Sequence, residues 1–376
     1  MQFNDIIGQT ATQHTLRQLV LHDRMPHALL LLGPEGSGQL ALALAYAQFL
    51  MCEDRSPDDA CGTCAHCRKI QKLAHPDLHF SYPTVGSKAT SDQYLREWRD
   101  AIGQNPYLNV NDWLQHIGAE NRQGNITKEE CVAIIKKLSL KTFEADAKVM
   151  VIWMPEYLAK EGNRLLKIIE EPPANTYFIL IAESAERILN TILSRCQLVK
   201  VPKLSDQDVI QGLQRIHPDL GDRVSSIAHL SEGNFNTALQ LAQEKGNAYD
   251  ELFLDWMRKA YKGNGVELVK WTEQFAKLGR ENQKHFLFYA LHFMRELLVH
   301  KVTGQTDLRL QEAERASALK LAGILEPDQL EHMVRLLTDC HYHIERNANP
   351  KILLLDVGIQ LHQFIRRTHP DMVATH

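Results

Sequence analysis

Four cysteines lie close together in the chain, at a spacing that suits a bound metal ion. They are Cys52, Cys61, Cys64 and Cys67, and the last three are each separated by two residues. Four thiolates match the tetrahedral ligand set of structural Zn²⁺ and leave no open position for a substrate. The spacing therefore predicts a structural Zn²⁺ site. An iron–sulfur cluster, which uses similar ligands, and four unliganded thiols are the weaker alternatives.

A glycine-rich stretch before these cysteines has the frame of a phosphate-binding loop. Such a loop ends in Gly-Lys-Ser or Gly-Lys-Thr, where the Lys pairs with phosphates and the hydroxyl holds Mg²⁺. Gly33, Gly36 and Gly38 keep the frame, but Gln39 and Leu40 replace the Lys and the hydroxyl residue. Gln carries no charge and Leu cannot ligate a metal. The pattern therefore favours a degenerate phosphate loop over an ordinary glycine-rich turn. ATP hydrolysis is not expected, and nucleotide binding through backbone amides is left open.

The acidic element of an ATP-hydrolysing site is also missing. In such sites a buried strand ends in acidic residues that hold Mg²⁺ and activate water. Here the apolar run 148–153 ends in Trp153-Met154-Pro155. This loss is independent of the loop substitutions, and both predict the frame of an ATPase without its chemistry.

The elements that position these residues predict an α/β domain over residues 1–202. Four short apolar runs are typical of buried strands: 27–33, 148–153, 177–182 and 197–201. Helical patterns lie between them, at 40–51, 127–140 and 162–171. This alternation predicts βαβ units and a mostly parallel sheet. Residues 79–125 are polar and rich in turn signals, and we interpret them as an insertion rather than a core element.

The character of the chain changes after residue 202, where no strand pattern follows. We predict a small helical lid domain over 203–245 and a larger helical collar domain, for oligomerisation, over 246–376. The chain has 376 residues, and its 42 Lys and Arg against 46 Asp and Glu give a net charge of −4. This balance argues against a polybasic nucleic-acid binder. No apolar run approaches the ~20 residues of a membrane span, so we expect a cytoplasmic protein with reduced thiols and no membrane contact.

Several short motifs, taken together with the cysteine cluster, resemble the bacterial clamp-loader subunits of the AAA+ class. The motifs are Ile7-Gly-Gln9, Pro26-His27-Ala28, His75-Pro76-Asp77, Leu165-Leu166-Lys167-x-x-Glu170-Glu171-Pro172-Pro173 and Thr191-Ile-Leu-Ser194-Arg195-Cys196. The resemblance is strong over residues 3–202, and it implies a P-loop, AAA+-like α/β fold. It also implies a place in the DNA polymerase III holoenzyme. The partners would be other clamp-loader subunits (gamma/tau and delta), with the sliding clamp and primed DNA, in a hetero-oligomer.

Within this family the departures favour the delta-prime type, a stator that does not hydrolyse ATP. The motor type needs an intact phosphate loop and an Arg in a Gly-x-x-Arg pattern of its small helical domain. This chain has Gly233-Asn-Phe-Asn236 there. The resemblance therefore implies no catalysis by the isolated chain. The alternatives are a gamma/tau-like ATPase with a divergent nucleotide site, or a stand-alone zinc-containing nucleic-acid-binding protein. The near-neutral charge weighs against the latter.

The resemblance also implies a role for Arg195, which lies between Ser194 and Cys196. In the family this Arg is an arginine finger that reaches the ATP bound in the neighbouring subunit. Guanidinium is planar, always charged and forks onto phosphate oxygens, so it stabilises the charge of a departing phosphate. The plainer alternative is a surface Arg paired with a carboxylate. With the flanking residues and the family pattern, the finger is favoured.

Overall fold

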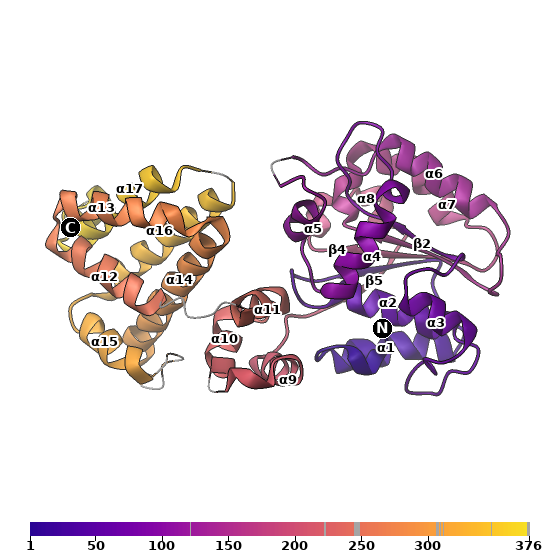
Figure 1. Cartoon of the computed structure of the whole chain (residues 1–376), viewed down its shortest axis with the longest axis horizontal. Coiled ribbons are helices and arrows are strands. Elements are labelled where there is room, and N and C mark those ends of the chain that lie inside the picture. The colour runs from indigo at the N-terminus through magenta and orange to yellow at the C-terminus, as the bar shows by residue number, and fades with distance from the viewer. Residues whose placement is uncertain are drawn as a thin grey trace. The chain divides into compact units, whose positions relative to one another are not determined.

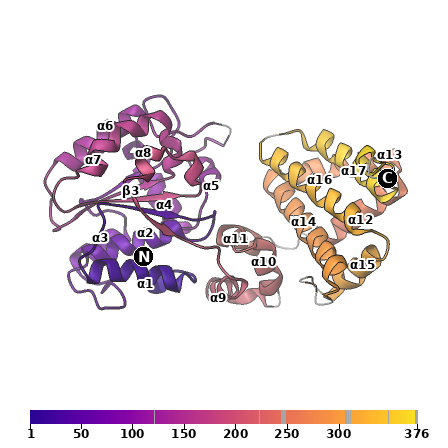
Figure 2. The same cartoon turned by 180° about the vertical axis from the view of Figure 1, so that it is seen from behind.

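The computed structural model describes the chain except residues 121, 222, 244–248, 306, 307, 309, 311, 347 and 374–376. Two compact units are present (Figures 1 and 2). Unit 1 comprises residues 1–220 and 231–240, and unit 2 comprises 221–230 and 241–376. The predicted boundary between lid and collar, at 245–246, lies outside the described residues.

A five-stranded parallel sheet forms the centre of unit 1, in the order β2-β3-β4-β1-β5. The strands are β1 (Ala28–Leu32), β2 (Leu78–Ser81), β3 (Lys148–Trp153), β4 (Thr176–Ala182) and β5 (Gln197–Lys200). Every residue of β3 is buried, as expected for a central strand covered on both faces. The predicted parallel α/β sheet is thus confirmed, and the four predicted apolar runs are four of its strands.

The structure differs from the sequence-based interpretation at β2. Residues 79–81, assigned to an insertion outside the core, are hydrogen-bonded to β3 as an edge strand. The rest of the 79–125 stretch is anchored by buried aromatic rings. Trp98 stacks on Tyr82 with ring centroids 4.1 Å apart and contacts Trp153 at the end of β3 at 5.2 Å. The stretch is therefore packed against the sheet rather than held away from it.

Helices cover both faces of the sheet (Figure 1). On one face lie α1 (Thr10–Leu21), α2 (Gln39–Met51) and α3 (Ala65–Gln71), and on the other α6 (Lys128–Ser139), α7 (Leu166–Glu170) and α8 (Asn190–Leu193). The remaining helices of unit 1 are α4 (Leu95–Gln104), α5 (Val110–His116), α9 (Asp206–Ile216) and, as far as residue 240, α11 (Phe235–Gln243), together with short 3₁₀ turns. All residues of α2 are buried, which explains why its sequence is apolar except for Gln39 and Gln48.

Two of the predicted helices begin differently from a simple capped helix. Thr127 caps α6 by accepting a hydrogen bond from the Glu130 amide at 3.0 Å. The Glu130 carboxylate does not complete a capping box, because it accepts from the Ser91 amide at 2.8 Å instead. The helix expected over 162–171 is shorter. Residues Pro155–Leu165 form 3₁₀ turns, and α-helical geometry begins only at Leu166.

The described residues of unit 2 form helices and their connecting turns, with no strand among them. It contains α10 (Arg223–Ser231), α12 (Tyr249–Lys262), α13 (Gly265–Phe275), α14 (Arg280–Thr303), α15 (Glu312–Ala322), α16 (Pro327–Glu345), α17 (Pro350–Ile365) and α18 (Pro370–Val373). Its own hydrophobic core is centred on Trp256 and Trp271, whose rings stack 5.0 Å apart beside Phe286. None of the helices in the described part of the chain is long and apolar enough to cross a membrane.

Candidate functional site

The glycine-rich loop lies between β1 and α2, where a phosphate-binding loop would lie. Gly36 and Gly38 have φ angles of +70° and +91°, which side-chain-bearing residues rarely adopt. A Cβ on Gly33 would lie 2.2 Å from the backbone oxygen of Val201, so this position has no room for one. The glycines therefore maintain the loop conformation, whether or not a phosphate ever binds there.

The side chain of Gln39 turns back into the loop. Its Nε2 donates hydrogen bonds to the backbone oxygens of Gly33 and Pro34, the latter at 2.8 Å. The next residue, Leu40, is buried at 4% exposure and packs into the domain. The positions that would hold the phosphate-binding Lys and the metal-binding hydroxyl are thus used for internal packing.

Tyr107 covers the loop from the 79–125 stretch. A Cβ on Gly38 would lie 2.9 Å from the Tyr107 ring, and the Tyr107 hydroxyl accepts a hydrogen bond from the Ile7 amide at 2.9 Å. The space left beside the loop has a volume of about 20 Å³ and is also lined by Trp153 and Met154. A cavity of this size holds about one water molecule, whereas small-molecule sites are typically about 300–1,000 Å³.

Acidic residues that the sequence analysis did not single out lie around the same space. Glu183 follows directly after β4 and lines the cavity. Burial, and the charges of Glu35 and Glu156, raise the pKa of Glu183 to about 8. The same repulsion between negative charges that raises this pKa would also disfavour the binding of a phosphate group beside these carboxyl groups. The sequence signal for Glu183 was its position directly after the apolar run 177–182. Ligand-binding groups in parallel sheets commonly lie at the carboxyl ends of the strands.

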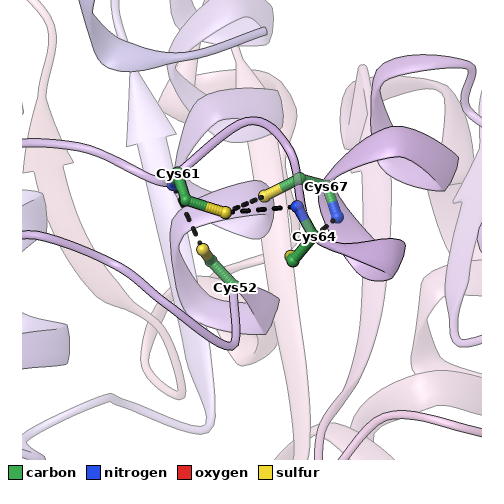
Figure 3. A group of neighbouring side chains, drawn as sticks. All are labelled: Cys52, Cys61, Cys64 and Cys67. Atoms are coloured by element: carbon green, nitrogen blue, oxygen red, sulfur yellow. Dashed lines mark hydrogen bonds between the residues drawn. The ribbon is translucent and has the colours of Figure 1, made fainter.

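The four cysteines of the predicted metal site lie together (Figure 3). One sulfur from each residue lies within 4.8 Å of the others. Cys52 follows α2 directly, while Cys64 caps α3 and Cys67 lies in its first turn. The two helices thus fix the cluster from both sides, and the loop between them carries Cys61.

Backbone amides point at these sulfurs in the manner expected around thiolates. Cys61 Sγ accepts from the amides of Thr63 and Cys64 at 3.4 and 3.3 Å, and Cys52 Sγ accepts from the Cys61 amide at 3.3 Å. The amides lower the pKa of Cys61 to about 6. Burial raises the pKa of Cys52 and of Cys67, so these two need a cation to become thiolates.

The donor set fits a tetrahedral ion. Zn–S bonds of about 2.3 Å place the sulfurs of a tetrahedral site about 3.8 Å apart. The sulfurs of Cys61 and Cys67 are 4.0 Å apart. The nearby imidazoles are engaged elsewhere, because His66 Nδ1 and His75 Nε2 share a 2.7 Å hydrogen bond. The arrangement of Cys52, Cys61, Cys64 and Cys67 can therefore bind a metal ion, with four sulfurs and no imidazole.

Arg195 follows α8 at the surface of unit 1. Its Nε donates to Glu170 Oε2 at 2.8 Å and its Nη1 donates to the Thr191 backbone oxygen at 2.9 Å. The side chains of the ion pair are 31% and 55% exposed, and such pairs typically contribute less than about 1 kcal/mol. The guanidinium is therefore accessible and weakly held. Ser194 beside it is exposed, while burial raises the pKa of Cys196 to about 11 and keeps it a thiol.

The structure brings some of the predicted site residues together and separates others. Gly33, Gly36 and Gly38 form one loop, and the four cysteines form one cluster at the far end of α2. Arg195 contacts neither group through a hydrogen bond or an ion pair that the described residues show. Among the described residues, the glycine-rich loop, the cysteine cluster and Arg195 thus lie at three separate places on unit 1.

Comparison with known proteins identifies relatives. Residues 8–205, more than half of the chain, match the sequence model of a family described as DNA polymerase III, delta subunit. The delta-prime subunit of Bacillus subtilis is 26% identical over 270 residues, which are 66% of this chain and 70% of that protein. The delta-prime subunit of Haemophilus influenzae is 28% identical over 339 residues, 88% of each chain.

A motor-type subunit also aligns. The tau subunit of B. subtilis DNA polymerase III is 21% identical over 394 aligned positions, which cover 99% of this chain and 63% of that protein. The family match and the delta-prime relatives confirm the resemblance found in the sequence. The chain belongs to the delta-prime family of DNA polymerase III clamp-loader subunits.

Proposed function

We propose that this chain is the non-hydrolysing stator of a DNA polymerase III clamp loader. In this role it assembles with gamma/tau-type and delta-type subunits and helps them to load the sliding clamp onto primed DNA. The observation that carries the proposal is the filled phosphate loop. Gln39 turns into it, Tyr107 covers it, and about 20 Å³ of space is left beside it.

The same observation weighs against the alternative of a gamma/tau-like ATPase. An ATPase needs a cation beside the phosphates and an acidic group for Mg²⁺ and water. The loop has Gln39 at the position of the cation and a buried Leu40 at the position of the metal-binding hydroxyl, and β3 ends in Trp153 and Met154 instead of acidic residues. The alternative of a stand-alone nucleic-acid-binding protein is disfavoured by membership of a clamp-loader family.

Arg195 is the residue that we propose acts on a neighbour. Its guanidinium is partly exposed and is held by a surface ion pair with Glu170, so a stronger anionic partner can displace the carboxylate. The γ-phosphate of an ATP bound in the adjacent subunit is such a partner. Arg195 would then be an arginine finger supplied in trans, with Ser194 and Cys196 shaping the turn that presents it.

The proposed metal is structural Zn²⁺, held by Cys52, Cys61, Cys64 and Cys67. Four thiolates satisfy a tetrahedral ion completely, so the ion would cross-link α2 and α3 rather than bind substrate. The N–H···S bonds from the amides of Cys61, Thr63 and Cys64 support this assignment, because they stabilise negative sulfur.

The proposed collar is the helical region from 246 to 376. Its support is an aromatic core of its own, and three of its apolar side chains are strongly exposed: Val266, Val302 and Ile352, at 65%, 67% and 71% exposure. Replacing these three by Asp should reduce co-purification with the other subunits while the helical circular dichroism persists. Full co-purification of the triple variant would place the assembly surface elsewhere.

The stator role is tested by ATP hydrolysis. The purified chain should not hydrolyse ATP, whereas a loader reconstituted with Arg195→Ala should lose clamp- and DNA-stimulated turnover at one site. Fingers contribute about 10³–10⁵ in rate at their own site, and the loss for the whole complex is smaller if the other sites fire independently. Arg195→Lys should rescue poorly, because ammonium lacks the planar fork.

The matched control is Arg187→Ala, since Arg187 lies in the turn before α8 and stacks on Tyr157. It should leave turnover unchanged. Equal turnover of the wild-type and Arg195→Ala complexes, with equal complex formation, would reduce Arg195 to an ordinary surface residue.

A further inference from the structure

The part of the chain without an assigned role is the stretch between β2 and α6, and its most constrained part is residues 105–112. We call these residues the bridging segment. They connect α4 to the start of α5 and lie against both the glycine-rich loop and α11. All three elements belong to unit 1 over the residues concerned.

On one side the bridging segment contacts the glycine-rich loop. Asn109 Nδ2 donates to Glu35 Oε1 at 2.9 Å, and the Tyr107 ring lies against Gly38. The Tyr107 hydroxyl also accepts from the Ile7 amide, which ties the N-terminal turn to the same point. A phosphate-binding loop offers this surface to a nucleotide, and here the chain itself occupies it.

On the other side the bridging segment contacts α11. Asn105 Nδ2 donates to Asn236 Oδ1 at 2.6 Å, and the Asp112 carboxylate accepts from Asn236 Nδ2 at 2.6 Å and from Gln240 Nε2 at 3.0 Å. The Tyr107 ring packs edge-on against Phe235 with centroids 4.9 Å apart. Bonds to a charged carboxylate are stronger than bonds between neutral groups, so Asp112 is the principal polar anchor.

The loop and α11 also contact each other directly. The Phe235 amide donates to the Gly36 oxygen at 3.0 Å, and Asn234 Nδ2 donates to the same Glu35 oxygen that Asn109 contacts, at 3.1 Å. A Cβ on Gly36 would lie 1.8 Å from Asn234 Oδ1. This close approach is possible because Gly36 has no Cβ.

We propose that the bridging segment is a built-in ligand, which replaces a nucleotide as the link between the phosphate loop and α11. It fills the space beside the loop and bonds to both elements, so it excludes ATP and ADP and fixes α11 in one orientation. A ligand that is part of the chain has a high effective concentration and never dissociates from the protein. The inference extends the proposed function and rests on it, because a fixed orientation of α11 is useful in a stator.

The link itself is rigid, because both of its ends are anchored. The Trp113 indole, one residue after the bridging segment, donates to the Pro83 oxygen at 2.7 Å and lies 5.2 Å from Trp98. Trp98 in turn packs on Tyr82 and Trp153. Aromatic contacts of this kind fix ring positions through dispersion and shape. The segment is therefore braced against the sheet and does not form a free flap.

Hydrogen–deuterium exchange on the full chain tests the link. Asp112→Ala removes the acceptor of two hydrogen bonds from α11, so amide exchange over residues 234–240 should accelerate about tenfold or more. Exchange in β3 should stay unchanged, which shows that the sheet remains folded. The matched control is Asn111→Ala, because Asn111 is the exposed neighbour of Asp112. It should leave α11 as slow as in the wild type.

A milder variant keeps the test decisive if Asp112→Ala fails to fold. Asp112→Asn leaves one acceptor oxygen and the same shape, so it should give an intermediate acceleration. Unchanged exchange in folded Asp112→Asn and Asp112→Ala would overturn the proposed link.

Nucleotide titration tests the occupancy. Calorimetry with ATP or ADP, each with Mg²⁺, should show no binding to the wild-type chain at millimolar nucleotide. Binding that Asn109→Ala or Tyr107→Ala strengthens would support displacement of an internal ligand. Wild-type binding in the micromolar range that protects the Gly33–Leu40 amides from exchange would overturn the inference.

These results are separable from those on the proposed function. They use the isolated chain, whereas the stator role is measured in the reconstituted complex. A chain with a mobile α11 that still contributes Arg195 would refute the bridge alone. A chain with a fixed α11 that does not join a loader would refute the stator role alone.

Discussion

The glycine-rich loop precedes α2 and the cysteine cluster begins directly after it, and the two differ in whether their ligand-binding residues are present. Both are short frames suited to a ligand. In the loop, the ligand-binding side chains are replaced, and Gln39 and Tyr107 occupy the space. In the cluster, all four sulfurs remain together and backbone amides point at them.

The difference teaches what each frame contributes. A phosphate loop serves turnover, so a subunit that does not hydrolyse ATP can lose its chemistry while its glycines still shape the fold. A four-sulfur cluster serves stability, because it cross-links a small segment with little core of its own. The segment 52–67 contains many exposed residues, so we expect an ion bound by the four sulfurs to stabilise it.

The largest effect is expected at the cluster. Cys64→Ser should lower bound zinc from about one ion per chain to nearly none, and it should lower the free energy of unfolding by about 3 kcal/mol or more, because the remaining ligands no longer satisfy the ion. Elemental analysis and thermal unfolding measure the two effects. Cys196→Ser, outside the cluster, is the control and should keep the zinc. Wild-type protein that contains no zinc after careful purification would contradict the prediction that the cluster, unlike the glycine-rich loop, still binds its ligand.

A smaller effect is expected when the loop frame itself is changed. Gly38→Ala places a Cβ at a φ of +91° and 2.9 Å from the Tyr107 ring, so it should destabilise the chain by about 1–3 kcal/mol. Gly103→Ala is the matched control, because Gly103 lies in α4 with no heavy atom within 4 Å of an added Cβ. It should be neutral or slightly stabilising. Equal melting temperatures for both variants would mean that the loop is not closed as described.

The acidic surroundings of the loop predict a pH dependence. Glu183 has a pKa raised from 4.5 to about 8, so between these values the folded state holds a proton that the unfolded state releases. Its contribution to stability therefore falls as pH rises through this window. Glu183→Gln should stabilise the chain at pH 8 by about 1 kcal/mol and change little at pH 4.5. Melting curves at both pH values measure this. The exposed Glu186→Gln is the control, and parallel profiles for Glu183→Gln and the wild type would refute the assignment.

The smallest effect is expected from restoring the consensus loop residues. The double variant Gln39→Lys and Leu40→Thr should still show no ATP hydrolysis, because Tyr107 covers the loop and the end of β3 has no acid. A phosphate-release assay measures turnover, with a gamma/tau-type subunit as the positive control. Measurable turnover would show that two substitutions alone separate this loop from an active one.

Much of the fold could be predicted because its signals are local. The apolar runs 28–32, 148–153 and 176–182 are central strands, and buried parallel strands read as continuous apolar segments. β2 was missed because it is a four-residue edge strand in which His79 and Ser81 interrupt the apolar pattern. The substitutions in the phosphate-loop motif could also be recognised from the sequence, because Gln39 and Leu40 stand at the positions where the motif has Lys and Ser or Thr.

The sequence by itself determined the parallel sheet, the degenerate loop, the four-cysteine cluster and the family, because each depends on residues near one another in the chain. Only the tertiary structure decided that the loop is closed and what closes it. The hydrogen bonds from Asn109 to Glu35 and from the Ile7 amide to the Tyr107 hydroxyl join residues 74 and 100 positions apart. No periodicity or spacing encodes such a contact, because it forms only after the fold has brought the bridging segment to the glycine-rich loop.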